Sequence, residues 1–172
     1  MELKRIEILD SAKNVIKEYS ISKEGDTTNI NTYKYDKNNK EIFSHKKLNS
    51  EGWTWDIHSI YDCNSNLIKS FRISSENGIK DTTEVYNYTY NAKNKLVSKN
   101  YYYKKEFRNK TDYIYNQLDQ LEEEQFFEGD PSHVDVITLY KYDDNGNLIK
   151  KNHNDYTNIG DKEVYTYRFT YW

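Results

Sequence analysis

Residues 140–151, YKYDDNGNLIKK, decide the fold of this chain. Tyr140 and Tyr142 are separated by one residue and precede Asp143, an Asn/Gly-rich turn follows, and Leu148 then begins an apolar pair. Aromatic residues at every second position indicate a β-strand, and Asp, Asn and Gly favour the backbone conformations of tight turns. The stretch therefore predicts two antiparallel strands that meet at a hairpin corner.

The same pattern recurs along the chain at nearly constant spacing. Aligning the sequence on the Asp or Asn of each corner gives six repeats, at intervals of 26, 26, 29, 25 and 27 residues. A truncated seventh unit begins near Tyr165. The aligned residues are Asp10, Asp36, Asp62, Asn91, Asn116 and Asp143. Five of the six follow a tyrosine, and in five repeats the residue five positions later is apolar, as in an array of equivalent supersecondary units.

Glycines predict the second corner of each repeat. Gly25, Gly52, Gly78, Gly129 and Gly160 lie 13 to 17 residues after their Asp or Asn, and Gly146 lies in the Asp143 turn. Glycine tolerates the positive φ of hairpin corners, and the one proline, Pro131, falls at such a corner. The fold class predicted is therefore all-β: a single antiparallel meander of about 12–13 strands, built from ~26-residue hairpin repeats into a curved open sheet. We expect one domain over residues 1–172.

Tyrosine explains how so polar a chain can fold. Mean hydropathy is −1.09, and 18 of the 172 residues are tyrosine. Disordered chains lack aromatic and β-branched residues, which this chain has in quantity. We expect the tyrosine rings to pack in rows across a thin sheet while their hydroxyl groups remain in water.

Net charge and cysteine content limit the classes of partner and the cellular compartment that we expect. A net charge of −3 gives no general attraction to nucleic acid or to anionic membranes. The single cysteine, Cys63, cannot form an internal disulfide, and residues 1–10 contain no apolar run typical of a signal peptide. We therefore expect a cytoplasmic protein that binds neither nucleic acid nor membrane.

Residues 140–148, with the pattern Y-x-Y-D-x-x-G-N-L, resemble the YD repeat of rearrangement-hotspot (Rhs) proteins, teneurins and related bacterial toxin-delivery proteins. The resemblance recurs from about Leu9 to Tyr167. Repeats of that family form β-hairpin ribbons that spiral into a shell, often around a toxin domain. The resemblance implies a short stand-alone version of this repeat fold and a connection to toxin systems.

Catalytic and metal-binding signals are weak. Asp56 and His58 share a strand face and could act as a base and its orienting partner, but two solvated polar residues opposite the face of Trp53 and Trp55 are the better explanation of the pair. The Asp62 and Asp143 turns carry oxygen-bearing side chains at alternate positions, as calcium loops do, yet neither has the downstream acid such a loop needs. We expect no enzymatic activity and no cofactor, and we attribute both segments to turn formation.

Charged residues are unevenly distributed. Residues 118–136 contain seven acids and no Lys or Arg, whereas residues 93–110 contain seven cations and one acid. Opposite charges on neighbouring strands could simply stabilise the sheet. Alternatively, the acidic stretch with its two phenylalanines could dock a basic protein. The residues predicted to bind such a partner are Glu122, Glu123, Glu124, Phe126, Phe127 and Glu128.

Together these features favour a non-enzymatic protein-binding protein. The leading hypothesis is an immunity protein that neutralises a cognate bacterial toxin by covering its active surface. The alternative is a carbohydrate-binding or adhesive repeat segment of a larger surface or toxin-delivery protein. In that case the aromatic residues stacking on glycan would be Trp53, Trp55, Tyr101, Tyr102 and Tyr103.

Overall fold

The computed structural model describes residues 4–48, 53–76, 78–157 and 162–166, and these residues form strands and turns without a helix. None of the described residues therefore forms a helix able to span a membrane. The strands are β1 (Lys4–Leu9), β2 (Val15–Ile21), β3 (Thr27–Tyr35), β4 (Glu41–Leu48), β5 (Thr54–Tyr61), β6 (Leu67–Glu76), β7 (Ile79–Tyr90), β8 (Leu96–Tyr103), β9 (Glu106–Tyr115), β10 (Leu121–Glu128), β11 (Val136–Tyr142), β12 (Leu148–Asp155) and β13 (Lys162–Thr166).

Each strand is hydrogen-bonded to its neighbours in the sequence, so the order in the sheet runs from β1 to β13. All the described pairings are antiparallel, for example β1 with β2 and β11 with β12. The prediction of an all-β open meander is thereby confirmed. The chain divides into two compact units, residues 1–86 with 103–105 and residues 87–102 with 106–172, which are described separately. One domain over the whole chain stays a prediction.

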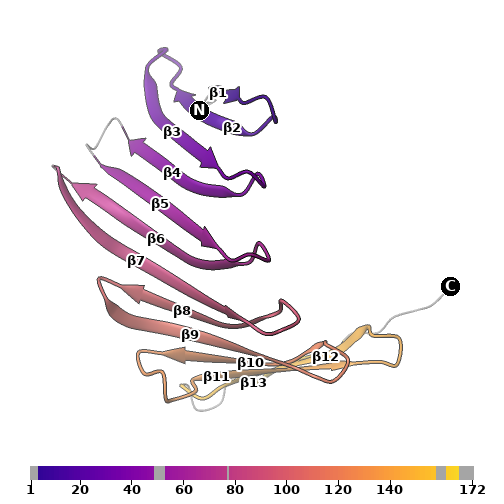
Figure 1. Ribbon diagram of the computed structural model, residues 1–172. Coiled ribbons are helices and arrows are strands. Elements are labelled where there is room, and N and C mark those ends of the chain that lie inside the picture. Colours follow the sequence, from indigo (N-terminus) through magenta and orange to yellow (C-terminus); the bar gives the residue numbers. More distant parts are fainter. Residues whose placement is uncertain (1–3, 49–52, 77, 158–161, 167–172) are drawn as a thin grey trace. The chain divides into compact units, whose positions relative to one another are not determined.

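Every repeat begins with the same five-residue turn. At Asp143, its backbone N–H donates to the carbonyl of Asn147 (2.9 Å), and the N–H of Gly146 donates to the carbonyl of Asp143 (2.9 Å). Asp143 Oδ1 also accepts the N–H groups of Asn145 and Asn147, at 3.0 and 2.8 Å. The same four bonds form in the turns at Asp10, Asp36, Asp62, Asn91 and Asn116. In the first unit the three Asp turns lie along one side of the strands (Figure 1).

The fourth residue of each turn adopts a left-handed conformation. It is glycine only at Gly146, whereas Lys13, Asn39, Ser65, Asn94 and Asp119 occupy the equivalent position with φ between 59° and 66°. This conformation costs an L-residue about 1–2 kcal/mol. The repeated side-chain and backbone bonds of the turn offset that cost.

Glycine corners follow the prediction in part. Gly25, Gly78 and Gly129 have positive φ at corners between strands, while Gly52 and Gly160 lie outside the described residues. Between β8 and β9, however, the corner is formed by Lys104 and Lys105, with φ of 49° and 71°. Two successive positive φ values are typical of the type I′ turn that closes two-residue hairpins.

In four of the repeats, the tyrosine before the turn is hydrogen-bonded to the preceding repeat. The hydroxyl group of Tyr142 donates to the backbone carbonyl of Leu121, at 2.9 Å, and we call this bond the tyrosine latch. The acceptor stands five positions after the Asn that begins the preceding repeat. Equivalent latches join Tyr35 to Val15, Tyr61 to Glu41 and Tyr115 to Leu96, at 2.9, 3.1 and 2.9 Å. The expectation that tyrosine hydroxyl groups remain in water is therefore wrong for these four residues, because each hydroxyl satisfies a backbone acceptor.

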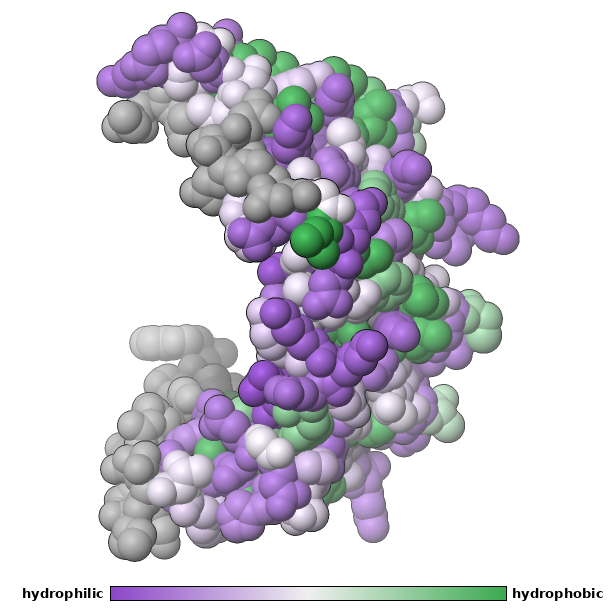
Figure 2. Space-filling view, turned by 90° about the vertical axis from the view of Figure 1, so that its left-hand side faces the viewer, coloured by the Kyte–Doolittle hydropathy of each residue, from purple (hydrophilic) through white to green (hydrophobic). Residues whose placement is uncertain are grey.

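The side chains of this single-layer sheet are only partly covered. Phe127, 5% exposed, is the one buried hydrophobic side chain among the described residues. Ile8 and Ile60 are each 44% exposed. Figure 2 shows hydrophobic side chains dispersed among hydrophilic ones on one face. With so little apolar surface removed from water, the hydrogen-bonded turns and latches carry an unusual share of the folding specificity.

Candidate functional site

The second unit presents a face lined by tyrosine across β9, β10 and β11. Tyr113 pairs directly with Glu124, and Glu124 pairs directly with Thr138, so these three residues share one face. Because side chains alternate along a strand, Tyr115 and Tyr140 lie on the same face. We call it the tyrosine face of β9–β11.

Charges are sorted between the two faces of these three strands. By alternation Glu122, Glu124, Phe126 and Glu128 of β10 lie on the tyrosine face, and we call these four residues the acidic strip. All the Lys and Arg residues of β9, β10 and β11, namely Arg108, Lys110 and Lys141, alternate onto the opposite face. The tyrosine face of these strands therefore carries three carboxylates and no cationic side chain.

Two of the three cations of the opposite face, Arg108 and Lys110, have acidic partners on that face. Lys110 Nζ lies 2.8 Å from a carboxylate oxygen of Asp112, and Arg108 Nη2 lies 2.8 Å from Glu106 Oε2. These bonds leave the acidic strip without neutralisation from β9, β10 or β11. On the next strand, β12, Lys151 and Asp155 add one charge of each sign to the tyrosine face.

Glu124 connects the acidic strip to the tyrosines. Tyr140 donates its hydroxyl to Glu124 Oε2 at 2.9 Å. Burial, followed by this hydrogen bond and the negative charge of Glu124, raises the pKa of Tyr140 far above the ordinary value. Burial and the charge of Glu124 also raise the pKa of Tyr113. Tyr140 and Tyr113 therefore stay protonated beside Glu124. The hydrogen bond from Tyr140 orients the Glu124 carboxylate.

The structure places the six residues predicted to bind a partner on two faces. Glu122, Glu124, Phe126 and Glu128 form the acidic strip, and Glu122 and Glu128 are exposed. Glu123 and Phe127 point to the opposite face, where Lys110 Nζ lies 3.9 Å above the Phe127 ring and Glu123 Oε1 accepts a 2.6 Å hydrogen bond from Gln125. The interaction of all six with a partner stays a prediction.

Pairing of opposite charges within the sheet was the simpler interpretation of the charged stretches. Such pairs are present at the turns. Lys93 Nζ contacts Asp119 Oδ2 at 2.7 Å, which joins the turns of two successive repeats. Lys95 Nζ also donates to the carbonyl of Asp119. Charge pairing thus accounts for part of the pattern, and the acidic strip is the part that it leaves unneutralised within β9–β11.

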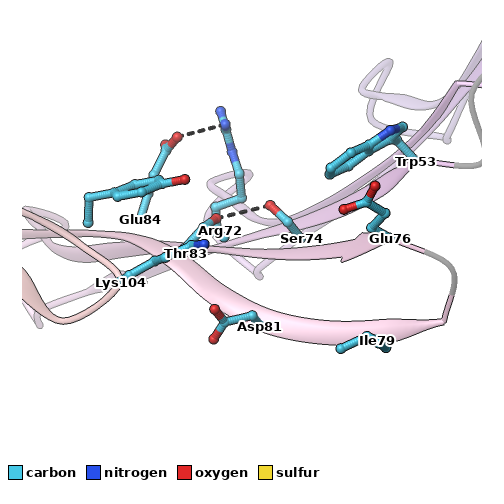
Figure 3. A pocket seen from close by; sticks show the side chains of 10 residues that line it. Trp53, Arg72, Ser74, Glu76, Ile79, Asp81, Thr83, Glu84 and Lys104 are labelled. Carbon is cyan, nitrogen blue, oxygen red and sulfur yellow. Dashed lines mark hydrogen bonds and ion pairs between the residues drawn. The ribbon is translucent and has the colours of Figure 1, made fainter.

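The first unit contains a hollow of about 600 Å³ beside Trp53. Trp53 and Glu76 lie at one end of it, and an ion pair between Arg72 and Glu84 lies at the other (Figure 3). Arg72 Nη1 is 2.8 Å from Glu84 Oε1. The buried Nε of Arg72 has no hydrogen-bond partner among the described residues, so the guanidinium group is only partly satisfied.

The remaining walls of the hollow come from β6, β7 and the corner after β8. Ser74 and Thr83 share a hydrogen bond of 3.0 Å between their hydroxyl groups. Asp81 lies on β7, and Lys104 Nζ lies 5.8 Å from the centre of the Tyr103 ring, with both of these last residues lining the hollow. Donors, acceptors and two aromatic rings therefore converge here. Sequence reasoning missed Arg72, Glu84 and Asp81, because their convergence depends on side chains of separate strands.

Of the five aromatic residues predicted to stack on glycan, the structure brings Trp53 and Tyr103 to this hollow. Trp55 pairs with Ser74 on β6 but does not line the hollow. Tyr101 and Tyr102 belong to the second unit, where Tyr102 contacts the ring of Phe107 edge-on at 5.9 Å. Their glycan-binding role stays a prediction.

Asp56 and His58 do not form a pair with each other. Asp56 Oδ1 lies 2.6 Å from Nδ1 of His45 on the neighbouring strand. His58 lies between Phe43 and Phe71, with ring centroids 5.1 and 4.7 Å away. Solvated polar residues are thus the wrong description of both, because each is engaged by neighbours across β4, β5 and β6.

The turn carboxylates are engaged by the turn itself. In the Asp62 turn, Oδ1 accepts two backbone N–H groups and Oδ2 accepts the side-chain amide of Asn66, at 3.0 Å. These hydrogen bonds from Asn66 lower the pKa of Asp62. Within the described ranges no group of three His, Cys, Asp or Glu side chains is arranged to hold a metal ion. Cys63 is exposed in this turn.

No protein-family model and no curated protein matches the chain. Among solved structures, the crystal structure of TcdB2-TccC3 is similar over 95% of this chain, with a TM-score of 0.54 and 14% sequence identity. TcdB2-TccC3 without its hypervariable C-terminal region is also similar over 95% of this chain, with a TM-score of 0.53 and 14% identity. This similarity supports a YD-repeat-like fold.

The similarity concerns a small part of the larger proteins. This chain covers 10% of each matched chain, so both matched proteins are far longer than this one. The shared hairpin repeat agrees with the resemblance that the Y-x-Y-D pattern carries. At this level of identity the comparison establishes the fold.

Proposed function

We propose that this chain is a non-enzymatic protein-binding protein whose acidic strip docks a basic partner. The observation that carries the proposal is the sorting of charge on β9–β11, where three glutamates share the tyrosine face and all cationic side chains lie on the other face. An unneutralised strip speeds the encounter with a partner of opposite charge. Tyrosine and phenylalanine beside it supply contact area at low entropic cost.

Within that class, an immunity protein is the function we favour. The chain shares its fold with part of a toxin complex, and a repeat sheet of this size offers a surface that can cover the active region of a toxin domain. Such a protein acts in the cytoplasm of the cell that makes the toxin, the compartment expected from the sequence. Inhibition by coverage requires no catalytic group.

Capture followed by a toxicity assay tests this function. The full chain is immobilised, proteins of the source cells are captured, and each captured protein is expressed alone and together with the chain. We expect one basic captured protein to arrest growth alone and to become harmless on co-expression. A variant with Glu122→Lys and Glu128→Lys should lose this protection, because reversal of both exposed charges repels a basic surface.

Two outcomes would overturn the proposal. One is that no captured protein is toxic by itself. The other is that protection persists in the Glu122→Lys, Glu128→Lys variant while that variant remains folded.

A further inference from the structure

We propose that the hollow beside Trp53 in the first unit is a binding site for a neutral carbohydrate. This inference goes beyond the protein-binding function and rests on different residues, in a different unit. A volume of about 600 Å³ is within the range of small-molecule sites. The residues that converge on it supply both the apolar and the polar contacts that a sugar ring requires.

Trp53 provides the apolar contact. Its side chain is 37% exposed, so much of the indole is available to a ligand rather than committed to packing. Tyr103 lines the same hollow and adds a second aromatic ring. The C–H face of a pyranose ring is apolar and flat, and an exposed indole is a suitable surface for it to stack on.

The polar groups of the hollow favour an uncharged ligand rich in hydroxyl groups. Arg72 and Lys104 supply donors, while Glu76, Asp81 and Glu84 supply acceptors. Three carboxylates and two basic groups, of which Arg72 and Glu84 are already paired, leave a net charge of only −1, so the hollow has no strong attraction for an ion of either sign. Sugar hydroxyl groups both donate and accept, so a neutral sugar can bind the carboxylates and the basic groups together without requiring the Arg72–Glu84 pair to separate.

Two of these groups are available without breaking an existing interaction. Glu76 and Asp81 form no ion pair or hydrogen bond with other described residues, and both are exposed. In Figure 3, Glu76 lies next to the Trp53 ring and Asp81 lies on the adjacent strand, β7. A ring stacked on Trp53 would lie beside Glu76, and Asp81 lines the same hollow from β7. Hydrogen bonds to charged acceptors are stronger than those between neutral groups.

The test uses the full chain on an array of neutral and charged oligosaccharides, followed by calorimetric titration of the neutral glycan that is best retained. Trp53→Ala should weaken binding about tenfold or more, as expected for loss of a central aromatic contact. Trp55→Ala is the matched control, because Trp55 lies on β5 opposite Ser74 but does not line the hollow. That control should change the affinity by less than about twofold.

Asp81→Asn provides a second test that preserves the shape of an exposed side chain. It should weaken binding about tenfold, because a charged acceptor becomes a neutral one. Raising the salt from about 50 to about 500 mM should leave binding unchanged, because the ligand is uncharged. The acidic-strip variant Glu122→Lys, Glu128→Lys should bind the glycan normally, so failure of the protein-binding proposal would not affect this result.

Retention of no neutral glycan would overturn the inference. So would equal loss in Trp53→Ala and Trp55→Ala, or binding that is unaffected by both Trp53→Ala and Asp81→Asn. Preferential retention of charged glycans with strong salt dependence would assign the hollow to a different class of ligand.

Discussion

At the scale of single residues, the turn that begins each repeat depends on one side-chain oxygen. The Oδ1 atom of the aligned Asp or Asn accepts two backbone N–H groups in all six turns, and Asn91 and Asn116 serve as well as Asp143. The amide oxygen that Asn shares with Asp is therefore sufficient for the turn. This explains why Asp and Asn both serve at the aligned position.

Two substitutions of the aligned aspartate distinguish the contribution of its oxygen from that of its charge. Asp143→Ala should lower the free energy of unfolding by about 1–2 kcal/mol, because two backbone donors lose their acceptor. Asp143→Asn, the matched control, should change it by less than about 0.5 kcal/mol. Urea unfolding of both variants measures the difference. Equal destabilisation by the two substitutions would show that charge rather than the shared oxygen closes the turn.

The left-handed position of the turn gives a reciprocal pair of substitutions. Ser65→Gly should stabilise the chain by about 0.5–1 kcal/mol, because glycine adopts the positive φ of 66° without strain. Gly146→Ala should destabilise it by about 1 kcal/mol, since an added Cβ would lie 3.2 Å from Gln120 Nε2 at a φ of 82°. Thermal unfolding reports both. Effects of the same sign would contradict the role assigned to this position.

At the scale of strands, the tyrosine latch fixes four of the hairpins against the one before. The latch joins a side chain at the end of one strand to a backbone carbonyl at the start of the neighbouring strand, as in Tyr142 to Leu121. The neighbouring strand is fixed in register because a slip of one residue would move the acceptor away. The hydroxyl group, and not only the ring, therefore explains the choice of tyrosine over phenylalanine.

Tyr142→Phe tests the latch directly. It should destabilise the chain by about 1 kcal/mol, because the carbonyl of Leu121 loses its donor while the ring remains. Tyr156→Phe is the control, since that side chain is 56% exposed and should contribute nothing measurable. Denaturant unfolding of the two variants provides the comparison. If the Tyr142→Phe variant were as stable as the parent, the claim that the hydroxyl group stabilises the chain would be wrong.

Tyr33 on β3 lies beside Glu18 on β2, and its ionisation should make the stability of this strand pair fall at high pH. Burial, followed by the charge of Glu18, raises the pKa of Tyr33 to about 12 from an ordinary value of 10.0. The folded pKa lies above the unfolded one, so the stabilisation is fully present below about pH 10 and is lost as the pH rises through about 12. Tyr33→Phe cannot ionise and should lose less stability over that window. Parallel pH profiles for the two proteins would contradict this assignment.

At the scale of the whole molecule, the sequence predicts the repeat well because its signals are local. The aligned Asp or Asn, the tyrosine before it and the return of apolar residues after it all lie within one hairpin, and the structure confirms the corner at each position. The Lys104–Lys105 corner was missed because neither residue is typical of a positive φ, so nothing local marks it.

Binding surfaces were less predictable, because they depend on strand register. The sequence predicted one patch from six residues between Glu122 and Glu128, but the alternation of side chains along β10 divides them between two faces. Phe127, expected as an anchor, lies buried on the face of Lys110. The hollow beside Trp53 likewise needs Arg72 and Glu84 of separate strands. Such placements follow only from coordinates.

One measurement tests the central claim most directly: the affinity of the chain for the basic protein that it captures. The chain is compared with the Glu122→Lys, Glu128→Lys variant on the tyrosine face and with Glu123→Lys, which changes the same strand on the opposite face. At about 50 mM salt the first variant should bind at least about tenfold more weakly, and Glu123→Lys should bind within about twofold of the parent. Equal losses in the two variants, or no loss in either, would contradict the assignment of partner binding to the tyrosine face.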